Sequence, residues 1–309
     1  MQSHHFSYPV NLSHLKKRAD FLSKIRAFFA ERDVLEVETP LLAHAPVTDP
    51  HIDAIETSGI PGYLQTSPEY AMKRLLAMGI GSCFQLCKAF RVDPLSRIHN
   101  PEFTMLEFYR LGFDDHDLMN EVDELLQRVF NFSPSIRMTY EDAFLKFLKI
   151  SALHSSGDTV KALFVEQFGP IPHSENFSKD DWLMLLFSHG IEPFLTGNSP
   201  YFIHDFPASQ AALARLKDGG VSGRFEVYIE GIELGNGYHE LQDPAQQKSR
   251  FDGDLALRKS LGKKLVPVDH HLLDALDHGL PNCAGIALGI DRLVMVALKA
   301  KRLSDIAVI

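Results

Sequence analysis

What the sequence lacks disfavours several classes of protein. Its 309 residues include only three cysteines and no CxxC pair, so neither a disulfide framework nor a cysteine zinc site is indicated. No apolar run reaches the roughly 18 residues that a membrane helix needs, and the N-terminus lacks the basic start and apolar stretch of a signal peptide. We therefore expect no membrane association and a cytoplasmic location.

The charge and the common motifs are also informative by absence. The formal net charge is −9, whereas proteins held to nucleic acid mainly by phosphate contacts usually present a basic face. No GxSxG motif, Walker A loop, Rossmann fingerprint or internal repeat of 20 to 50 residues occurs. Any nucleotide must therefore be bound by a different scheme.

The apolar spacing predicts a mixed α/β chain of the α+β type. Helical spacing predicts helices over residues 13–32, 67–79, 114–130 and 181–190, and a further one from about Asp291. Alternation predicts strands over residues 34–42, 83–91 and 103–109. The last two form one antiparallel hairpin, and residues 224–241 form a second. Regular βαβ alternation is missing, so the sheet should be built from antiparallel strands.

Two arginines occupy positions suited to phosphate binding. Arg91 ends the strand at 83–91, and Arg292 lies in the first turn of the helix near Asp291. Guanidinium groups match phosphate oxygens and remain charged at every working pH, so the pair could clamp a polyphosphate. Each arginine alone is equally compatible with a surface ion pair.

Three glutamates recur at seven-residue spacing in the second hairpin. Glu226, Glu233 and Glu240 could hold Mg²⁺ beside a polyphosphate, or could form a solvated hairpin face. Strict alternation places Glu233 on the opposite face from Glu240. If all three serve one site, a β-bulge is predicted at Gly235 or Gly237.

A histidine-rich stretch offers a second possible metal site. His270, Asp274 and His278 recur at helical spacing, which fits either a metal site or a solvent-facing polar stripe.

Several segments of the sequence resemble the motifs of a known family. FR with a loop and HNPEFTMLEFY is similar to motif 2 of the class II aminoacyl-tRNA synthetases, and GIALGIDRLVMVAL is similar to motif 3. FLSKIRAFFAERDVLEVETPLL resembles motif 1, with Pro40 as its proline. TSPEYAMKRLL and RFEVYIEGIELGNGYHEL resemble the lysine branch. The resemblance implies the class II catalytic fold, a mainly antiparallel sheet of six or seven strands flanked by helices, in a homodimer.

The resemblance also implies a domain organisation and an acceptor. The resemblance begins at about residue 13, so we expect an N-terminal extension over 1–12, one catalytic domain over 13–309 and no anticodon-binding domain. Such a chain is similar to the synthetase paralogues that attach a lysine-type residue to elongation factor P. FIHDFPASQAAL at 202–213 fits that branch. Elongation factor P is thus the expected acceptor, and tRNA is not.

The resemblance assigns roles residue by residue. Arg91 and Arg292 would be catalytic, and Glu226 with Glu233 would bind Mg²⁺. ATP would be bound by Arg91, Val92, Asp93, His99, Asn100, Phe103, Glu233, Leu234, Gly289 and Arg292. The amino-acid substrate would be bound by Ser67, Pro68, Glu69, Glu107, Tyr109, Asn236, Tyr238, Glu240 and Ala287.

These roles define a reaction. Glu69, Glu107 and Glu240 would supply acceptors for a substrate with two ammonium groups, namely lysine or (R)-β-lysine. Its carboxylate would attack the α-phosphorus of ATP, and the aminoacyl-adenylate would pass its acyl group to a lysine side chain of elongation factor P. Positioning and charge neutralisation are sufficient for the first step, which explains the absence of a nucleophile triad.

The sequence departs from the family pattern at three points. Val92 and Asp93 follow Arg91 where the family has Arg-Asn-Glu, so one ATP contact is a methylene shorter. Ala287 replaces the glycine usual in synthetases, a ligase-like change that should reshape the amino-acid pocket, whereas Gly235 is synthetase-like. The choice between α-lysine and β-lysine therefore stays open.

Three other functions are compatible with the resemblance. A stand-alone lysyl-tRNA synthetase core would charge an RNA, and a non-catalytic regulator would keep only the fold. A small-molecule ligase of the asparagine-synthetase type would need an acidic substrate, which three pocket glutamates disfavour.

Overall fold

The computed structural model describes residues 10–308, which fall into two compact units. Unit 1 comprises residues 10–112, 128–131 and 242–308 of the described chain, and unit 2 comprises residues 113–127 and 132–241. Most of the N-terminal extension expected over 1–12 lies outside the described residues.

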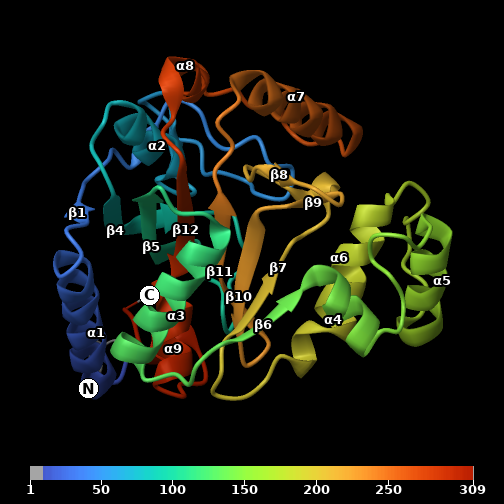
Figure 1. The fold of residues 1–309 in the computed structure, drawn as a ribbon, viewed down its shortest axis with the longest axis horizontal. Coiled ribbons are helices and arrows are strands. Elements are labelled where there is room, and N and C mark those ends of the chain that lie inside the picture. The colour runs from blue at the N-terminus through green and yellow to red at the C-terminus, as the bar shows by residue number, and fades with distance from the viewer. Residues whose placement is uncertain (1–9, 309) are drawn as a thin grey trace, which may run out of the picture. The chain divides into compact units, whose positions relative to one another are not determined.

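Unit 1 contains four strands in the order β1-β4-β5-β12, with β1 parallel to β4 and the other neighbours antiparallel (Figure 1). A separate pair, β2-β3, is also antiparallel. The elements are α1 (Leu12–Ala30), β1 (Leu35–Glu36), β2 (Leu42–Ala43), β3 (Tyr63–Leu64), α2 (Glu69–Ala77), β4 (Cys83–Phe90), β5 (Glu102–Leu111), α7 (Pro244–Ser260), α8 (His270–Gly279), β12 (Cys283–Gly289), α9 (Ile290–Ala297) and the 3₁₀ turn η3 (Leu303–Asp305).

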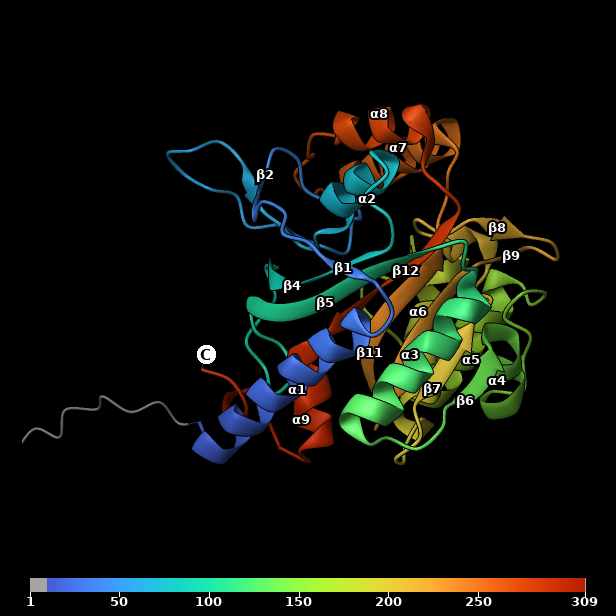
Figure 2. The same ribbon diagram turned by 60° about the vertical axis from the view of Figure 1, so that its left-hand side comes forward.

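Helix α1 covers one face of the β4-β5 hairpin (Figure 2). The Asn11 side chain caps the helix by accepting a hydrogen bond from the backbone N–H of Ser13. The Phe29 ring stacks on Phe84 of β4 with centroids 4.5 Å apart and contacts Phe108 of β5 at 4.9 Å. Glu107 lies on the opposite face of the hairpin, which α1 does not cover.

The strand predicted over 34–42 is largely wrong. Only Leu35 and Glu36 form β1, and the backbone N–H of Val37 adds one further hydrogen bond to Phe84. Pro40 has no N–H to donate to a ladder, and the chain leaves β4 before it reaches Pro40. The other predicted strands and helices of unit 1 are confirmed within one to three residues at their ends, α1 and α9 included.

A buried ion pair ties α1 to α9 and β5. Arg18 Nη2 lies 2.7 Å from Asp291 Oδ1 and donates to Thr104 Oγ1 at 2.8 Å. Asp291, whose side chain is 6% exposed, also accepts from the backbone N–H of Thr104. These contacts hold the start of α9, which carries Arg292, against the strand that carries Glu107.

Arg18→Met is expected to lower the free energy of unfolding by about 3 kcal/mol, because it leaves the Asp291 carboxylate buried without its cation. Urea denaturation measures this loss. The matched control is Lys24→Met, because the Lys24–Asp20 pair is more than half exposed and should contribute less than about 1 kcal/mol. Equal losses in the two variants would contradict a buried, stabilising role for Arg18.

Unit 2 contains four strands in the order β11-β10-β7-β6, with β6 parallel to β7 and the other neighbours antiparallel. Apart from one separate two-stranded pair in each unit, the described residues hold eight strands, mainly antiparallel as expected, where the family resemblance predicted six or seven. The elements are α3 (Asp115–Phe130, its last turn in unit 1), β6 (Ile136–Thr139), α4 (Tyr140–Phe147), α5 (Gly157–Phe168), α6 (Lys179–Gly190), η1 (Glu192–Phe194), β7 (Tyr201–His204), η2 (Ala208–Gln210), β8 (Leu216–Lys217), β9 (Val221–Ser222), β10 (Arg224–Ile229) and β11 (Ile232–His239).

Helices α4, α5 and α6 form the apolar core of unit 2 (Figure 1). Tyr140 of α4 stacks on Phe187 of α6 with centroids 5.3 Å apart, and Phe187 contacts Tyr228 of β10. This core fixes the face of β10 that carries Tyr228 and its neighbour Glu226. Over residues 10–308 no helix combines the length and the apolar character that crossing a membrane requires.

Candidate active site

Four predicted site residues of unit 1 share one face of its strands. Glu107 of β5 lies opposite Gln85 of β4 and opposite Ala287 of β12, and direct cross-strand neighbours point to the same side. Alternation along β5 adds Phe103 and Tyr109 to this face, which is the one that α1 does not cover. The side chain arrangement expected from the sequence is therefore present in this unit.

Arg91 and Phe103 lie together at one end of this face. The Arg91 guanidinium carbon is 5.3 Å from the centroid of the Phe103 ring, and its Nε donates to the carbonyl of Thr66 at 3.4 Å. Ala89, two residues before Arg91, pairs directly with Phe103. A cation and an aromatic shelf are thus adjacent, as binding of a phosphate and a purine requires.

The loop between β4 and β5 brings Arg292 to the same end. Arg292 Nε donates to the backbone carbonyl of Ile98 at 3.0 Å. Burial and the neighbouring charges of Arg292 and Arg91 lower the pKa of His99, which keeps its imidazole neutral near pH 7. His99 Nδ1 lies 2.9 Å from the hydroxyl of Ser96. Both arginines therefore lie close to the loop that carries His99.

Backbone hydrogen bonds hold Val92 and Asp93, the two residues that depart from the family pattern after Arg91. The Val92 N–H donates to the carbonyl of Asp53 at 2.8 Å, while its side chain is 59% exposed. The Asp93 N–H donates to the carbonyl of Arg91 at 2.9 Å. Asn100 donates to the carbonyl of Glu102, so its side chain braces the start of β5.

Glu107 is a buried carboxyl held by two hydroxyls. The side chain of Ser67 donates to Oε2 at 2.7 Å and that of Tyr109 to Oε1 at 2.6 Å, and Glu107 is 2% exposed. Burial, reinforced by the charge of Glu69, raises the pKa of Glu107 to about 8. Near neutral pH this carboxyl is therefore mostly protonated. A cation bound beside it would favour its ionised form.

Glu69 forms an ion pair with a lysine of the same helix. Its Oε1 accepts from the ammonium of Lys73 at 2.6 Å, and both side chains are largely buried. Sequence reasoning missed Lys73, although its spacing of four residues from Glu69 on a predicted helix is the signal for such a pair. Helix α2 begins at Glu69 with Pro68 as its N-cap, and the Ser67 hydroxyl accepts from the backbone N–H of Glu69.

The two predicted residues of β12 lie beside β5. Ala287 pairs directly with Glu107, so the methyl group that replaces the usual glycine is next to the buried carboxyl. Gly289 pairs with Met105 and precedes α9 as its N-cap. Ala287 is therefore placed where a side chain changes the room beside Glu107.

The hairpin of unit 2 contains a β-bulge, as predicted for the case in which Glu226, Glu233 and Glu240 serve one site. Glu226 pairs with Asn236, but Val227 pairs with Gly235 and Tyr228 with Glu233, so Leu234 is the extra residue. The bulge lies at Leu234, one residue before the nearer position predicted.

Because of the bulge, four predicted side chains share one face of β10 and β11. Cross-strand pairing puts Glu233 beside Tyr228 and Asn236 beside Glu226 on that face. Alternation along β11 extends the set, which comprises Glu226, Glu233, Asn236 and Tyr238. Glu240 follows the end of β11 and forms an isolated bridge with Ala214. A strictly regular strand would have turned Glu233 away.

Glu226 has two partners that the sequence did not indicate. Arg224 pairs with its Oε1, and the hydroxyl of Tyr228 donates to its Oε2. Both lie two residues away on the same strand, so alternation places them on the same face as Glu226. Alternation does not predict their direct contacts with its carboxylate. Each carboxylate oxygen has a second lone pair, so Glu226 with Glu233 still offers Mg²⁺ the hard oxygen ligands that it prefers.

Polar groups at the far end of β11 are suited to an ammonium or an amide. Asn236 Nδ2 donates to the hydroxyl of Tyr238 at 3.0 Å. Asn236 Oδ1 is buried, and no donor reaches it from the residues that the structure describes. Glu240 is 1% exposed. Buried acceptor oxygens of this kind suit a cationic substrate.

The predicted residues therefore form two groups, one in each unit. The third candidate, His270, Asp274 and His278 on α8, is an exposed stripe and forms no metal-ligand cluster within the described residues. The polar stripe is the better interpretation of that segment.

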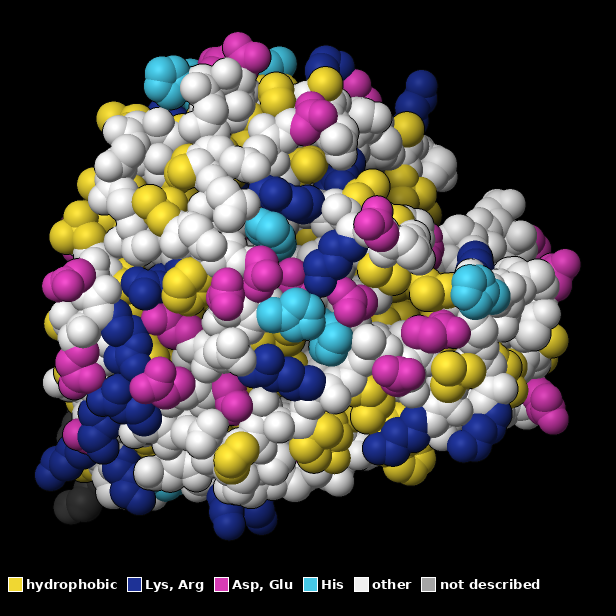
Figure 3. Space-filling view, viewed as in Figure 1, with side chains coloured by type: hydrophobic (Ala, Val, Ile, Leu, Met, Phe, Trp, Pro, Cys, Tyr) yellow, Lys and Arg dark blue, Asp and Glu magenta, His cyan; other side chains and the backbone are white. Residues whose placement is uncertain are grey.

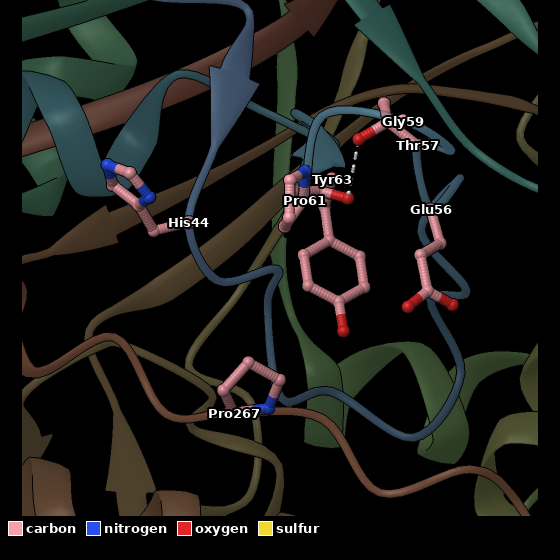
Figure 4. Close-up of a pocket in the computed structure, with 8 residues that line it drawn as sticks. His44, Glu56, Thr57, Gly59, Pro61, Tyr63 and Pro267 are labelled. Carbon is pink, nitrogen blue, oxygen red and sulfur yellow. Dashed lines mark hydrogen bonds between the residues drawn. The ribbon is translucent and has the colours of Figure 1, made fainter.

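A pocket of about 470 Å³ in unit 1 is separate from these groups. It is an open hollow in which Thr57 Oγ1 donates to the carbonyl of Gly62 at 3.0 Å (Figure 4). It is lined by His44, Glu56, Thr57, Gly59, Pro61, Gly62, Tyr63 and Pro267. None of the residues that the sequence assigns to ATP or substrate lines this pocket.

The mainly antiparallel strands flanked by helices are consistent with a class II synthetase fold. The family model of the class II tRNA synthetases (D, K and N) matches residues 4–308, so the chain belongs to this family. An elongation factor P-(R)-β-lysine ligase of Vibrio atlanticus (strain LGP32) is 49% identical over 308 residues, which cover 96% of this chain and 95% of the relative.

Further relatives carry the same name. One from Vibrio cholerae serotype O1 is 52% identical over 300 residues, covering 94% of this chain and 92% of the relative. One from Salmonella arizonae is 48% identical over 308 residues, covering 96% and 94%. The similarity therefore spans nearly the full length of each chain.

Proposed function

We propose that this protein is a ligase that activates (R)-β-lysine with ATP and transfers it to a lysine side chain of elongation factor P. The names of its relatives support this acceptor and this amino acid. Membership of the class II family supports the use of ATP. The geometry below supports the proposed substrate and residue roles.

The buried carboxyl of Glu107 is the observation that carries the choice of a cationic substrate. Two hydroxyls hold its oxygens, and Glu69 nearby is paired with Lys73. A buried carboxylate is costly unless a cation accompanies it, so an ammonium group of the substrate would stabilise its ionised form. An acidic substrate would bring no counter-charge for Glu107, which disfavours a ligase of the asparagine-synthetase type.

The arginines are proposed to act on the phosphates. The substrate carboxylate attacks the α-phosphorus, and pyrophosphate leaves with the bonding electron pair. Arg91 neutralises the negative charge that develops on the α-phosphate, and Arg292 binds the departing phosphates. Phe103 positions the adenine by stacking, so the reacting atoms are held in line. The amine of the acceptor lysine, once deprotonated, then displaces AMP and forms an amide bond.

Glu226 and Glu233 are proposed to hold Mg²⁺. The ion would neutralise charge on the pyrophosphate portion of ATP. In this chain the Arg224 guanidinium fixes the Glu226 carboxylate, so Arg224 would orient the metal ligand rather than bind nucleotide.

Further parts of the proposal concern organisation. We propose that residues 13–309 work as one catalytic domain, because a single family model matches residues 4–308. We also propose a homodimer, and a cytoplasmic location because elongation factor P acts in translation.

The test compares amino acids and acceptors. We expect ATP–pyrophosphate exchange with (R)-β-lysine and more weakly with lysine, but not with aspartate. We expect radiolabelled β-lysine to appear on purified elongation factor P and not on tRNA. Absence of exchange with either lysine isomer would refute the activation step, and label on tRNA alone would favour the stand-alone synthetase.

A further inference from the structure

The proposed function leaves one cluster of metal-ligating side chains in unit 2 without a role. His116, His204 and Asp205 each offer one ligand atom, and these atoms all lie within 4.8 Å of one another. It is the single such group found among residues 10–308. Figure 3 shows that one face of the molecule carries histidine side chains grouped with acidic and basic ones.

Different elements bring the three ligands together. His116 lies in the first turn of α3, His204 ends β7, and Asp205 follows it. The two imidazole rings meet edge to face with centroids 5.4 Å apart. Asp205 has φ of 57°, a conformation that non-glycine residues adopt rarely and that redirects the chain immediately after His204.

The surroundings fix Asp205 in place. His204 Nδ1 lies 2.9 Å from Asp205 Oδ2, while the ammonium of Lys217 donates to Asp205 Oδ1 at 2.8 Å. Lys217 also donates to Asp115 at 2.6 Å, and the Asp115 side chain is 1% exposed. One carboxylate oxygen of Asp205 is thus anchored by Lys217, and the other faces the imidazole.

A glycine makes room for this network. A Cβ atom added at Gly223 would lie 2.8 Å from the Cβ of His239, 3.5 Å from Asp115 Oδ1 and 3.6 Å from Cε of Lys217. The chain therefore packs tightly beneath the cluster. Its net charge, with Asp115 and Asp205 against Lys217, is one negative charge when the histidines are neutral.

The cluster is distinct from the substrate face. His204 pairs with Phe225 of β10, whereas Glu226 is the next residue along that strand and points to the other side. A ligand of His204 would therefore not compete with a ligand of Glu226 or Glu233.

We propose that His116, His204 and Asp205 form a Zn²⁺-binding site. Two imidazole nitrogens and one carboxylate oxygen are a ligand set that Zn²⁺ accepts, with water in the fourth position. Zn–N bonds of about 2.0–2.1 Å place tetrahedral ligands about 3.3 Å apart, so those ligand atoms that lie up to 4.8 Å apart must move closer together. The His116 side chain is 51% exposed and can turn without displacing packed neighbours. The bound ion cross-links the start of α3 to the end of β7.

The test uses the untagged full chain and Zn²⁺ alone. Wild type is expected to bind one Zn²⁺ that His116→Ala/His204→Ala does not bind, and to show a rise in its melting temperature with Zn²⁺ that the variant lacks. Lys217→Met, which removes the anchor of Asp205, is expected to weaken binding by roughly 10-fold to 100-fold. The absorption spectrum of bound Co²⁺ reports the tetrahedral ligand field and is expected only in wild type.

Two controls make the outcome decisive. His278→Ala removes an exposed histidine outside the cluster and should leave Zn²⁺ affinity unchanged. Glu233→Gln removes a proposed Mg²⁺ ligand and should also leave it unchanged, which separates this site from the active site. Unaltered Zn²⁺ binding in the double variant, or no binding in wild type, would overturn the proposal.

Discussion

Arg91→Ala is expected to lower kcat/KM for lysine-dependent ATP–pyrophosphate exchange by roughly 10²-fold to 10³-fold, about 3–4 kcal/mol of transition-state stabilisation. Its guanidinium lies beside Phe103 on the face that also carries Glu107. Charge on the α-phosphate grows as the substrate carboxylate attacks, and Arg91 lies beside the aromatic shelf proposed to hold the adenine. ATP binding, measured by calorimetry, should weaken as well, because the ground state already carries phosphate charge.

Arg97→Ala is the matched control for this change. Arg97 belongs to the same loop, is exposed and donates to the carbonyl of Lys301 at 3.3 Å. We expect wild-type exchange from it. Arg91→Lys keeps the charge but loses the planar fork, so it should recover only part of the activity. Equal loss in Arg97→Ala and Arg91→Ala would mean that net charge in the loop matters, and would remove Arg91 from the mechanism.

The parts of the site that local pattern controls were predictable from the sequence. Alternation over 83–91 and 103–109 correctly gave an antiparallel hairpin, and it placed Phe103, Glu107 and Tyr109 on one face. The rule needs only the two-residue period of a strand, which short-range sequence fixes. The glycine before α9 and the helix itself were equally local.

The parts that depend on pairing between strands were not predictable. The bulge was deduced from a functional assumption, but its position at Leu234 is set by the register of β10 against β11. The contacts of Arg224 and Tyr228 with the Glu226 carboxylate depend on side-chain conformations that alternation does not fix. The cluster of His116 with His204 joins residues far apart in sequence, so no spacing rule could reveal it.

Glu107→Gln is expected to raise KM for lysine roughly 10²-fold, about 3 kcal/mol, while ATP affinity stays close to wild type. The amide fills the same space between Ser67 and Tyr109 but cannot take up a negative charge. A substrate ammonium would therefore lose its buried counter-charge. Exchange kinetics with varied lysine, together with ATP calorimetry, measure the two effects separately. Glu102→Gln, an exposed change on the same strand, should alter neither.

The same carboxyl should couple lysine binding to a proton. Near pH 7, below its pKa of about 8, Glu107 is mostly protonated in the free protein, and an ammonium that binds beside it favours the ionised form. Lysine binding is therefore expected to release close to one proton, seen as a dependence of the binding enthalpy on the ionisation enthalpy of the buffer. Glu107→Gln should abolish that dependence, and its persistence would assign the proton to another group.

Stability offers an independent test of the same pKa. The folded protein holds a proton on Glu107 up to about pH 8, whereas the unfolded chain loses it near the ordinary value of 4.5. Between these values the folded state binds more protons, so the contribution of Glu107 to the free energy of unfolding must fall as pH rises. That contribution is fully present below pH 4.5 and lost by pH 8. Glu107→Gln does not titrate, so its melting temperature relative to wild type should increase from pH 5 to pH 8.5. A constant difference would mean that Glu107 ionises in the folded protein as it does in the unfolded chain.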